Sequence, residues 1–127
     1  MFTVDYEEAA GIVRYTSGGF LSLDEVRSYG LAVQDALARS RRRFGSVRML
    51  VLSVDSVIQS AEVMEAVRED TAWMSDPDDR MAIVISSSLA RMQAARTFGT
   101  DRQRAFATEA EARTWLGMDR PGAQAAL

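Results

Sequence analysis

Six hydroxyl or carboxylate side chains occur at two places where a strand-like run gives way to a helix-like segment. Hydroxyls at a helix N-terminus lie beside unbonded backbone amides and a partial positive charge, and together these groups can hold an anion. No glycine-rich loop that would cradle a nucleotide phosphate accompanies them. The same side chains also suit turns and helix caps, and we expect Ser60 and Ser88 to be caps. The candidate ligand- or partner-binding residues are Asp55, Ser56, Ser60, Ser86, Ser87 and Ser88.

Neither histidine nor cysteine occurs among the 127 residues, which narrows the chemistry further. Histidine is the commonest general base and metal ligand, and a cysteine thiolate supplies sulfur-ligated metals and thiol nucleophiles. The acids Asp76, Asp78 and Asp79 surround Pro77 without the spacing of a calcium-binding loop, so we expect a solvated turn there. The sequence therefore predicts a non-enzymatic protein with no metal site and no cofactor.

Five arginines gather near the expected end of the first long helix. Cations at a helix C-terminus complement the helix dipole, so we expect this cluster to be a solvated helix end. The net charge of −3 does not fit a nucleic-acid binder, which usually has a basic face. The cluster comprises Arg39, Arg41, Arg42, Arg43 and Arg48.

The N-terminal residues do not read as a signal peptide, since no basic region precedes an apolar stretch there. No apolar run approaches the roughly 20 residues that a membrane-spanning helix needs. We therefore expect a cytoplasmic protein with no membrane span.

The candidate binding residues follow two apolar runs, Met49–Val54 and Met81–Ile85, so the structure of these runs determines where those residues lie. Short, β-branched runs of this kind are typical of strands buried on both faces of a parallel sheet. Capping boxes at Ser22–Glu25 and Thr108–Glu111 predict two helix starts. The pattern predicts an α/β fold of order β-β-α-β-α-β-α-β-α, with a mixed, mainly parallel five-strand sheet and helices packed on it. The expected strands are 2–6, 12–16, 47–54, 80–86 and 103–107, and the expected helices are 22–44, 60–74, 89–98 and 108–116.

This order resembles the SpoIIAA-like fold of anti-sigma factor antagonists and of STAS domains, and especially the small stand-alone bacterial STAS/SEC14-like domains. The resemblance implies a single SpoIIAA-like domain over residues 1–118, followed by a flexible tail over 119–127. The matching segments are Ser17–Ser22 leading into Asp24 and Glu25, the strands Met49–Val54 and Met81–Ile85, and the ending Phe106–Thr108 with Ala112–Leu116.

In anti-sigma antagonists, a serine after the third strand is phosphorylated by a partner kinase. Ser60 is the residue that matches it here, but Gln59 replaces the aspartate of the motif, and Ala61 and Glu62 replace its serine and glycine. The likeness to Sec14 domains implies an apolar pocket in the relatives. It matches no residue of this chain to a lipid contact.

The resemblance implies a regulatory or protein-interaction module. The alternative is a carrier of a small apolar or amphipathic ligand in a Sec14-like pocket. Large flexible or aromatic side chains favour a protein partner or a homodimer, unless they pack in the core. These side chains are Trp73, Met74, Met81, Met92 and Phe98.

Overall fold

The computed structural model describes residues 2–18, 22–53, 60–69, 74–98 and 101–117. Within them the elements follow the predicted order, β-β-α-β-α-β-α-β-α. The strands are β1 (Phe2–Glu7), β2 (Ile12–Ser17), β3 (Arg48–Ser53), β4 (Arg80–Val84) and β5 (Gln103–Phe106). The helices are α1 (Leu23–Phe44), α2 (Ala61–Glu69), α3 (Ser88–Phe98) and α4 (Glu109–Gly117).

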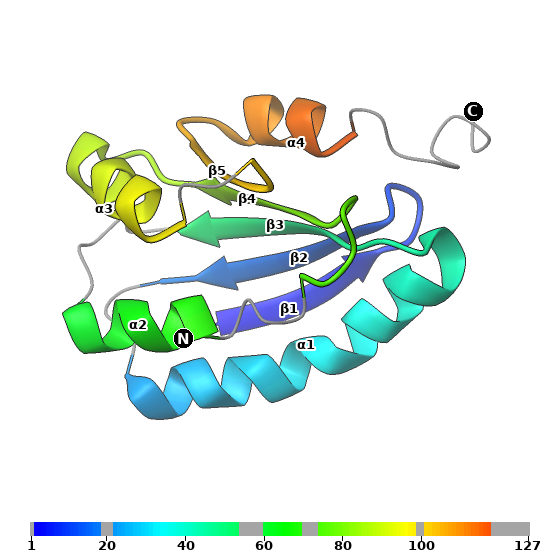
Figure 1. Cartoon of the computed structure of the whole chain (residues 1–127), viewed down its shortest axis with the longest axis horizontal. Coiled ribbons are helices and arrows are strands. Elements are labelled where there is room, and N and C mark those ends of the chain that lie inside the picture. The colour runs from blue at the N-terminus through cyan, green and yellow to red at the C-terminus, as the bar shows by residue number, and fades with distance from the viewer. Residues whose placement is uncertain (1, 19–21, 54–59, 70–73, 99–100, 118–127) are drawn as a thin grey trace.

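The strands form one mixed sheet in the order β1-β2-β3-β4-β5. Strand β1 runs antiparallel to β2, and every other pair is parallel. The two apolar runs therefore lie where the sequence predicts, as neighbouring inner strands. Because each crossover steps in the same direction and such crossovers are right-handed, α1, α2 and α3 share one face and α4 covers the other (Figure 1).

Side chains alternate between the two faces along each strand, so the sheet has a core on each side. Met49 packs among α1 and α3 residues, whereas its neighbour Leu50 packs with Trp115 and Leu116 of α4. The thicker core lies under the three crossover helices, and its α1 contribution includes Val33, which is 2% exposed.

Capping chemistry fixes both ends of the longest helix. The Ser22 hydroxyl accepts from the Glu25 amide at 3.1 Å, and the Glu25 carboxylate accepts from the Ser22 amide at 3.3 Å, which is a complete capping box. Gly45 ends α1 with a φ of 74°, and its amide donates to the Arg41 carbonyl at 2.9 Å. The predicted helix boundaries at 22 and 44 are confirmed.

The second helix ends earlier than the sequence predicts. Helix α2 is described as Ala61–Glu69, and Met74 lies outside it, in the segment that leads to β4. The prediction of a helix through residue 74 was wrong, because Met74 packs partly buried against the core from a loop instead of a helix face. Trp73 lies outside the described residues.

The predicted solvated acidic turn is wrong for Asp79, which is completely buried. Its carboxylate accepts from the Val47 amide at 2.7 Å, from the Asp76 amide at 3.1 Å and from the Arg41 guanidinium at 2.8 Å. Asp79 therefore ties the end of α1, the start of β3 and the turn before β4 to one another. Asp78 is exposed, as a turn residue should be.

The arginine cluster is also more than a solvated helix end. Arg41 pairs with buried Asp79, and Arg48 is fully buried inside β3. Arg48 donates to the Leu116 carbonyl at 2.9 Å, and its register neighbour Arg80 donates to the Trp115 carbonyl at 2.9 Å. Two guanidinium groups thus cap the C-terminus of α4, where the carbonyls carry partial negative charge.

Helix α4 also holds the outermost strand. Arg113 forms two hydrogen bonds with the Glu7 carboxylate of β1, at 2.9 and 2.7 Å, and a third with Glu109 at 2.7 Å. The hydrogen bond from Arg113 lowers the pKa of Glu7, and the same contacts raise the pKa of Arg113. This clamp joins the first strand to the last helix across the open face of the sheet.

Candidate functional site

Four of the six residues that the sequence singles out are described, and they lie at the carboxyl edge of the sheet, where β3 and β4 end. Strand β3 is followed by Ser60 at the start of α2, and β4 by Ser86–Ser88 at the start of α3. Asp55 and Ser56 fall outside the described residues, so their expected part in a site stays a prediction. In the described part of the chain, no hydrogen bond joins Ser60 to any of the three serines after β4.

Ser60 is a helix cap. Its hydroxyl accepts from the Val63 amide at 3.2 Å, and its carbonyl accepts from the Met64 amide at 3.0 Å. The bond to the hydroxyl satisfies one of the amides that the first turn of a helix leaves without an internal partner, and the bond to the carbonyl is the first regular bond of the helix. The predicted capping role is confirmed.

The cap of α3 is Ser87, not Ser88. The Ser87 hydroxyl accepts from the Ala90 amide at 3.3 Å, and its carbonyl accepts from the Arg91 amide at 2.9 Å. The prediction for Ser88 was wrong by one residue, because the helix begins one position earlier than expected and Ser88 becomes its first helical residue.

Arg91 closes over this serine segment, which sequence reasoning did not foresee. Its guanidinium donates to the carbonyls of Ile85 and Ser86, both at 2.8 Å, and to the Ser88 hydroxyl at 3.3 Å. The nearest cation is thus bonded to the loop itself. The serines and Arg91 together rigidify the junction of β4 with α3, which makes them a frame for the surface beside them.

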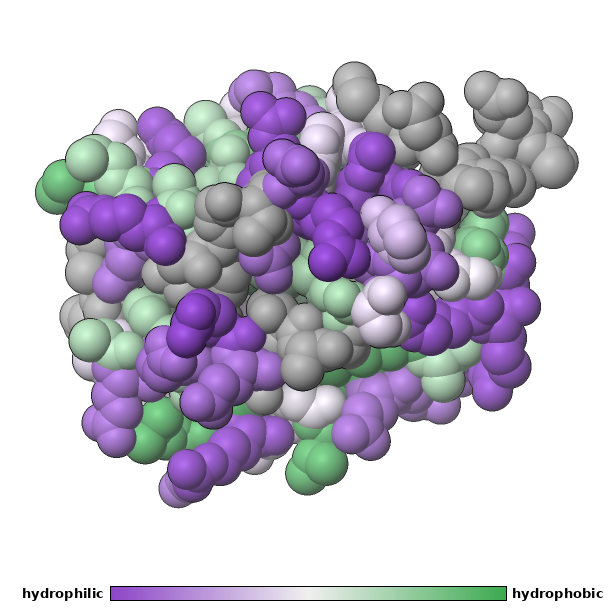
Figure 2. All heavy atoms as spheres, in the orientation of Figure 1, coloured by the Kyte–Doolittle hydropathy of each residue, from purple (hydrophilic) through white to green (hydrophobic). Residues whose placement is uncertain are grey.

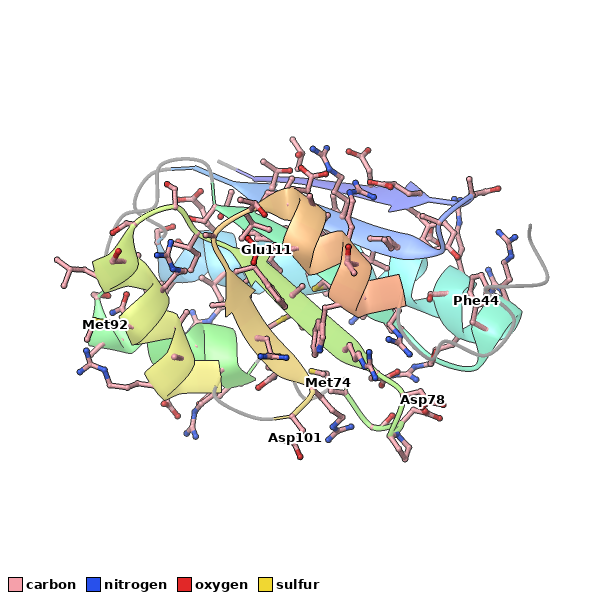
Figure 3. All side chains as sticks on the ribbon, turned by 90° about the horizontal axis from the view of Figure 1, so that it is seen from above. Phe44, Met74, Asp78, Met92, Asp101 and Glu111 are labelled. Carbon is pink, nitrogen blue, oxygen red and sulfur yellow. The ribbon has the colours of Figure 1, made fainter. Side chains whose placement is uncertain are left out.

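That surface is the outward side of α3. Leu89 is 67% exposed and Met92 is 55% exposed, whereas Ala90 and Ala94 on the opposite side are buried. Residues three apart lie on the same side of a helix, so Leu89 and Met92 form one apolar pair. Figure 3 shows Met92 on α3, at one end of the molecule.

A groove runs along each side of α3. The groove between α2 and α3 has a volume of about 660 Å³, and the groove between α3 and β5 has a volume of about 540 Å³. The first is lined by Ala61, Met64, Glu65, Arg68, Leu89, Gln93 and Arg96, and the second by Ser88, Arg91, Met92, Ala95, Gln103, Arg104 and Ala105.

The charge along these grooves is positive. Two arginines line each groove, and Glu65 is the one acid in either lining. Glu65 accepts from Arg68 at 2.7 Å, which raises the pKa of that guanidinium and neutralises the acid. Arg96 makes no hydrogen bond or ion pair with another described residue. The Arg104 guanidinium lies on the α4 side of the sheet, 5.8 Å from the centre of the Phe106 ring and 6.0 Å from that of Trp115. We call Leu89, Met92 and the arginines Arg68, Arg91 and Arg96 the α3 face.

Figure 2 shows this end of the molecule, at the left, as apolar side chains in green set directly beside hydrophilic ones in purple. Sequence reasoning named Met92 only as one member of a Met-rich set and did not name Leu89. The signal was present: alanines four residues apart, Ala90 and Ala94, alternate with the larger Leu89 and Met92. The described side chains of α3 that are buried are both alanines, and Leu89 and Met92 face outward.

Two general properties bound the chemistry. Across the residues that the structure describes, no three acidic side chains lie close enough together to hold a metal ion. None of the helices in those same ranges is both long and apolar enough to cross a membrane.

No model of a known protein family matches this sequence, and no curated protein and no solved structure shows significant similarity to it. The function must therefore be argued from the chain itself.

Proposed function

We propose that this protein is a non-enzymatic, regulatory protein-interaction module, and that the α3 face is its docking surface. The observation that carries the proposal is the exposure of Leu89 and Met92 side by side on a helix whose other side is buried. Large apolar side chains that share one exposed patch are typical of an interaction site, whereas scattered ones are ordinary.

The frame under this patch supports the same function. Ser87 caps α3, and Arg91 bonds the end of β4 to its first turn. A docking helix held in this way loses little conformational freedom when a partner binds, so less of the contact energy is spent on ordering it.

The charge of the α3 face supports an acidic partner. Each flanking groove presents two arginines, and Glu65 is already paired with Arg68. An acidic, amphipathic helix of another protein would place apolar residues on Leu89 and Met92 and a carboxylate beside Arg96. This is the helix-in-groove mode of recognition, with anchors repeating every three or four residues.

A homodimer through this same face is less well supported. A two-fold symmetric interface brings each patch against its own copy, so the arginines of the two copies would repel one another. The predicted self-association therefore stays an alternative that the measurement of oligomeric state decides.

The carrier function is the second candidate, and one observation favours it. The groove between α2 and α3 has a volume of about 660 Å³, which lies within the range of small-molecule sites. Its lining, however, includes the polar side chains of Glu65, Arg68, Gln93 and Arg96. An apolar ligand would lie against charges there, so we favour the protein partner.

The non-enzymatic part of the proposal is supported by what the serines do. The hydroxyls of Ser60 and Ser87 accept hydrogen bonds from helix amides, which is a capping geometry and not that of an activated nucleophile. The resemblance to SpoIIAA-like domains adds a family in which small α/β modules act by binding other proteins.

Affinity capture from the native host, followed by titration of the recovered partner, tests the proposal. The variants Leu89→Asp and Met92→Asp place a carboxylate in the apolar pair, and each should weaken binding about tenfold or more, as expected for a central anchor. The matched control is Leu31→Asp on α1, where an equally apolar side chain is 72% exposed. Leu31→Asp should leave the affinity unchanged.

Salt and oligomeric state give two further readouts. The affinity should fall as ionic strength rises, because the arginine contacts are solvent-exposed. The proposal would be overturned if Leu89→Asp and Leu31→Asp bound the partner equally well. A dimer that Leu89→Asp dissociates in sedimentation equilibrium would instead identify a second copy as the occupant.

A further inference from the structure

A second groove, of about 380 Å³, lies at the opposite edge of the sheet, and we infer that it binds a small anion of the phosphate or pyrophosphate type. We call it the basic groove. It is independent of the α3 face, because it lies between the end of β1 and the last turns of α1. It is lined by Tyr6, Glu8, Arg39, Arg42 and Arg43.

Helix geometry brings the three arginines together. Arg39, Arg42 and Arg43 are three and four residues apart, so their side chains project from one side of α1. They project toward the end of β1, which supplies Tyr6 and Glu8. In Figure 3, Phe44 at the end of α1 and Met92 on α3 lie at opposite ends of the molecule. Figure 1 likewise shows the C-terminal end of α1 far from α3.

The three arginines differ in how far their charges are engaged. Arg43 donates to the Glu8 carbonyl, and its guanidinium lies 4.9 Å from the centre of the Phe44 ring. Arg39 is half-exposed and makes only surface ion pairs, with Asp35 at 3.4 Å and with Glu8 at 4.0 Å. Such exposed pairs are weak. Arg42 forms no hydrogen bond or ion pair with another described residue, so its charge is available to a ligand.

Tyr6 lines the groove, and its hydroxyl, buried beneath the surface, is an unsatisfied donor. The ring of Tyr6 packs against the core, and its hydroxyl oxygen is buried without a hydrogen-bond partner in the described part of the chain. A buried polar group without a partner is costly. Phenylalanine would pack equally well at this position, so the hydroxyl needs another reason. An anion oxygen beside Arg42 would accept its proton.

Charge and size select the kind of ligand. Three arginines against one glutamate give the lining a positive balance, although the whole chain carries a net charge of −3. The helix C-terminus contributes a partial negative charge of only about half a unit, which the arginines exceed. A nucleic acid would need an extended basic surface, which a lining of five residues does not supply.

Calorimetric titration with inorganic phosphate and pyrophosphate, at an ionic strength held constant with chloride, tests the inference. Arg42→Ala should raise the Kd for pyrophosphate about tenfold, since it removes a charged partner. The matched control is Arg27→Ala, an exposed arginine near the start of the same helix. Arg27→Ala should leave the Kd unchanged.

Tyr6→Phe gives a second readout with opposite signs. Without the anion, the variant should unfold at the same temperature as the wild type or higher, because an unsatisfied buried hydroxyl is removed. With pyrophosphate, it should bind several-fold more weakly, because a donor is lost. A purely structural tyrosine would show neither the gain nor the anion-dependent loss.

Three outcomes would overturn the inference. Equal effects of Arg27→Ala and Arg42→Ala would indicate nonspecific screening. A Tyr6→Phe variant with wild-type pyrophosphate affinity would remove the hydroxyl from the site. Tighter binding of an unrelated phosphoserine peptide than of pyrophosphate, through the same residues, would mean that the occupant is a phosphoprotein and not a small anion.

Discussion

Among the residues that the structure describes, the fully buried charged side chains lie at one edge of the sheet, and the exposed apolar pair lies at the other. At the amino edge, Asp79 and Arg48 are fully buried, and their hydrogen bonds hold backbone groups of α4, of the turn before β4 and of the residue before β3. At the carboxyl edge, Arg96 is exposed and unpaired among the described residues, beside the exposed Leu89. The buried charges at the amino edge hold the fold together, whereas Arg39 and Arg42 at that edge and Arg96 at the carboxyl edge are exposed.

The difference shows that residue type alone does not assign a role to an arginine. Arg48 and Arg96 have the same chemistry, but Arg48 emerges from a strand beneath a helix end, whereas Arg96 emerges from the outer side of a helix. Desolvation makes the buried charges intolerant of change. Solvent makes the exposed ones tolerant, so four substitutions that span both edges should give effects on stability that decrease in a defined order.

Asp79→Ala should have the largest effect, a loss of about 3–5 kcal/mol in the free energy of unfolding. It removes the carboxylate that holds Arg41 and leaves the buried Val47 amide without its partner. Urea denaturation measures the loss. Asp78→Ala is the control from the same turn, and it should stay within about 0.5 kcal/mol of the wild type. Equal stabilities of the two variants would contradict the distinction between the edges.

Arg113→Gln tests a half-buried clamp between these extremes, and it should cost about 1.5–2 kcal/mol at neutral pH. Because the folded-state pKa of Glu7 lies below its ordinary value of 4.5, the contact stabilises the fold above that pH. This contribution is lost as the pH falls through the lowered folded-state pKa. Thermal melts between about pH 3 and pH 7 measure this loss. Below pH 4.5, the melting temperature of Arg113→Gln should fall less steeply with decreasing pH than that of the wild type. An unchanged slope would exclude Glu7 as its source.

Ser87→Ala should cost about 1 kcal/mol, as for other helix caps. Ser88→Ala is the control one residue away and should change the free energy of unfolding by less than about 0.5 kcal/mol. Chemical denaturation of the two variants compares them directly. A larger loss of stability for Ser88→Ala than for Ser87→Ala would mean that Ser88 is the cap, as the sequence predicts.

Leu89→Asp should have the smallest effect on folding, within about 0.5 kcal/mol, because the side chain is already in water. This variant sharpens the contrast most, since it combines near-native stability with the loss of partner binding. A large destabilisation would mean that Leu89 belongs to the core.

The sheet could be predicted from the sequence because its signals are local. The runs Met49–Val54 and Met81–Ile85 have no helical period, and the capping box at Ser22 and the glycine at 45 set the limits of α1. Apolar pattern and capping chemistry depend on residues close in the chain, so they can be read without the fold.

The buried charges could not be predicted in the same way, because their partners are distant in the sequence. Asp79 lies in a segment rich in proline and aspartate that is typical of a turn, and only the approach of α1 buries it. Arg48 did leave a signal, a charge inside an apolar strand. Its partner, the end of α4, lies 68 residues away.

The sequence predicted where the candidate site lies in the fold, but not which residues form it. The carboxyl ends of β3 and β4 were the right place to look, but the serines there cap helices, and the exposed pair Leu89 and Met92 lies beside them. From the sequence alone, apolar residues such as Leu89 are expected in the core. Only the burial of Ala90 and Ala94 in the structure shows which side of α3 faces inward.

The unbroken strand order has a consequence for how the chain is assembled during synthesis. Each strand pairs with the strand made just before it, so the sheet can grow from one end as the chain emerges, without waiting for distant segments. The bond between Glu7 and Arg113 is the exception, since it joins residues 106 apart. This bond can form only after α4 has been synthesised, and it joins β1 to the last helix of the described chain.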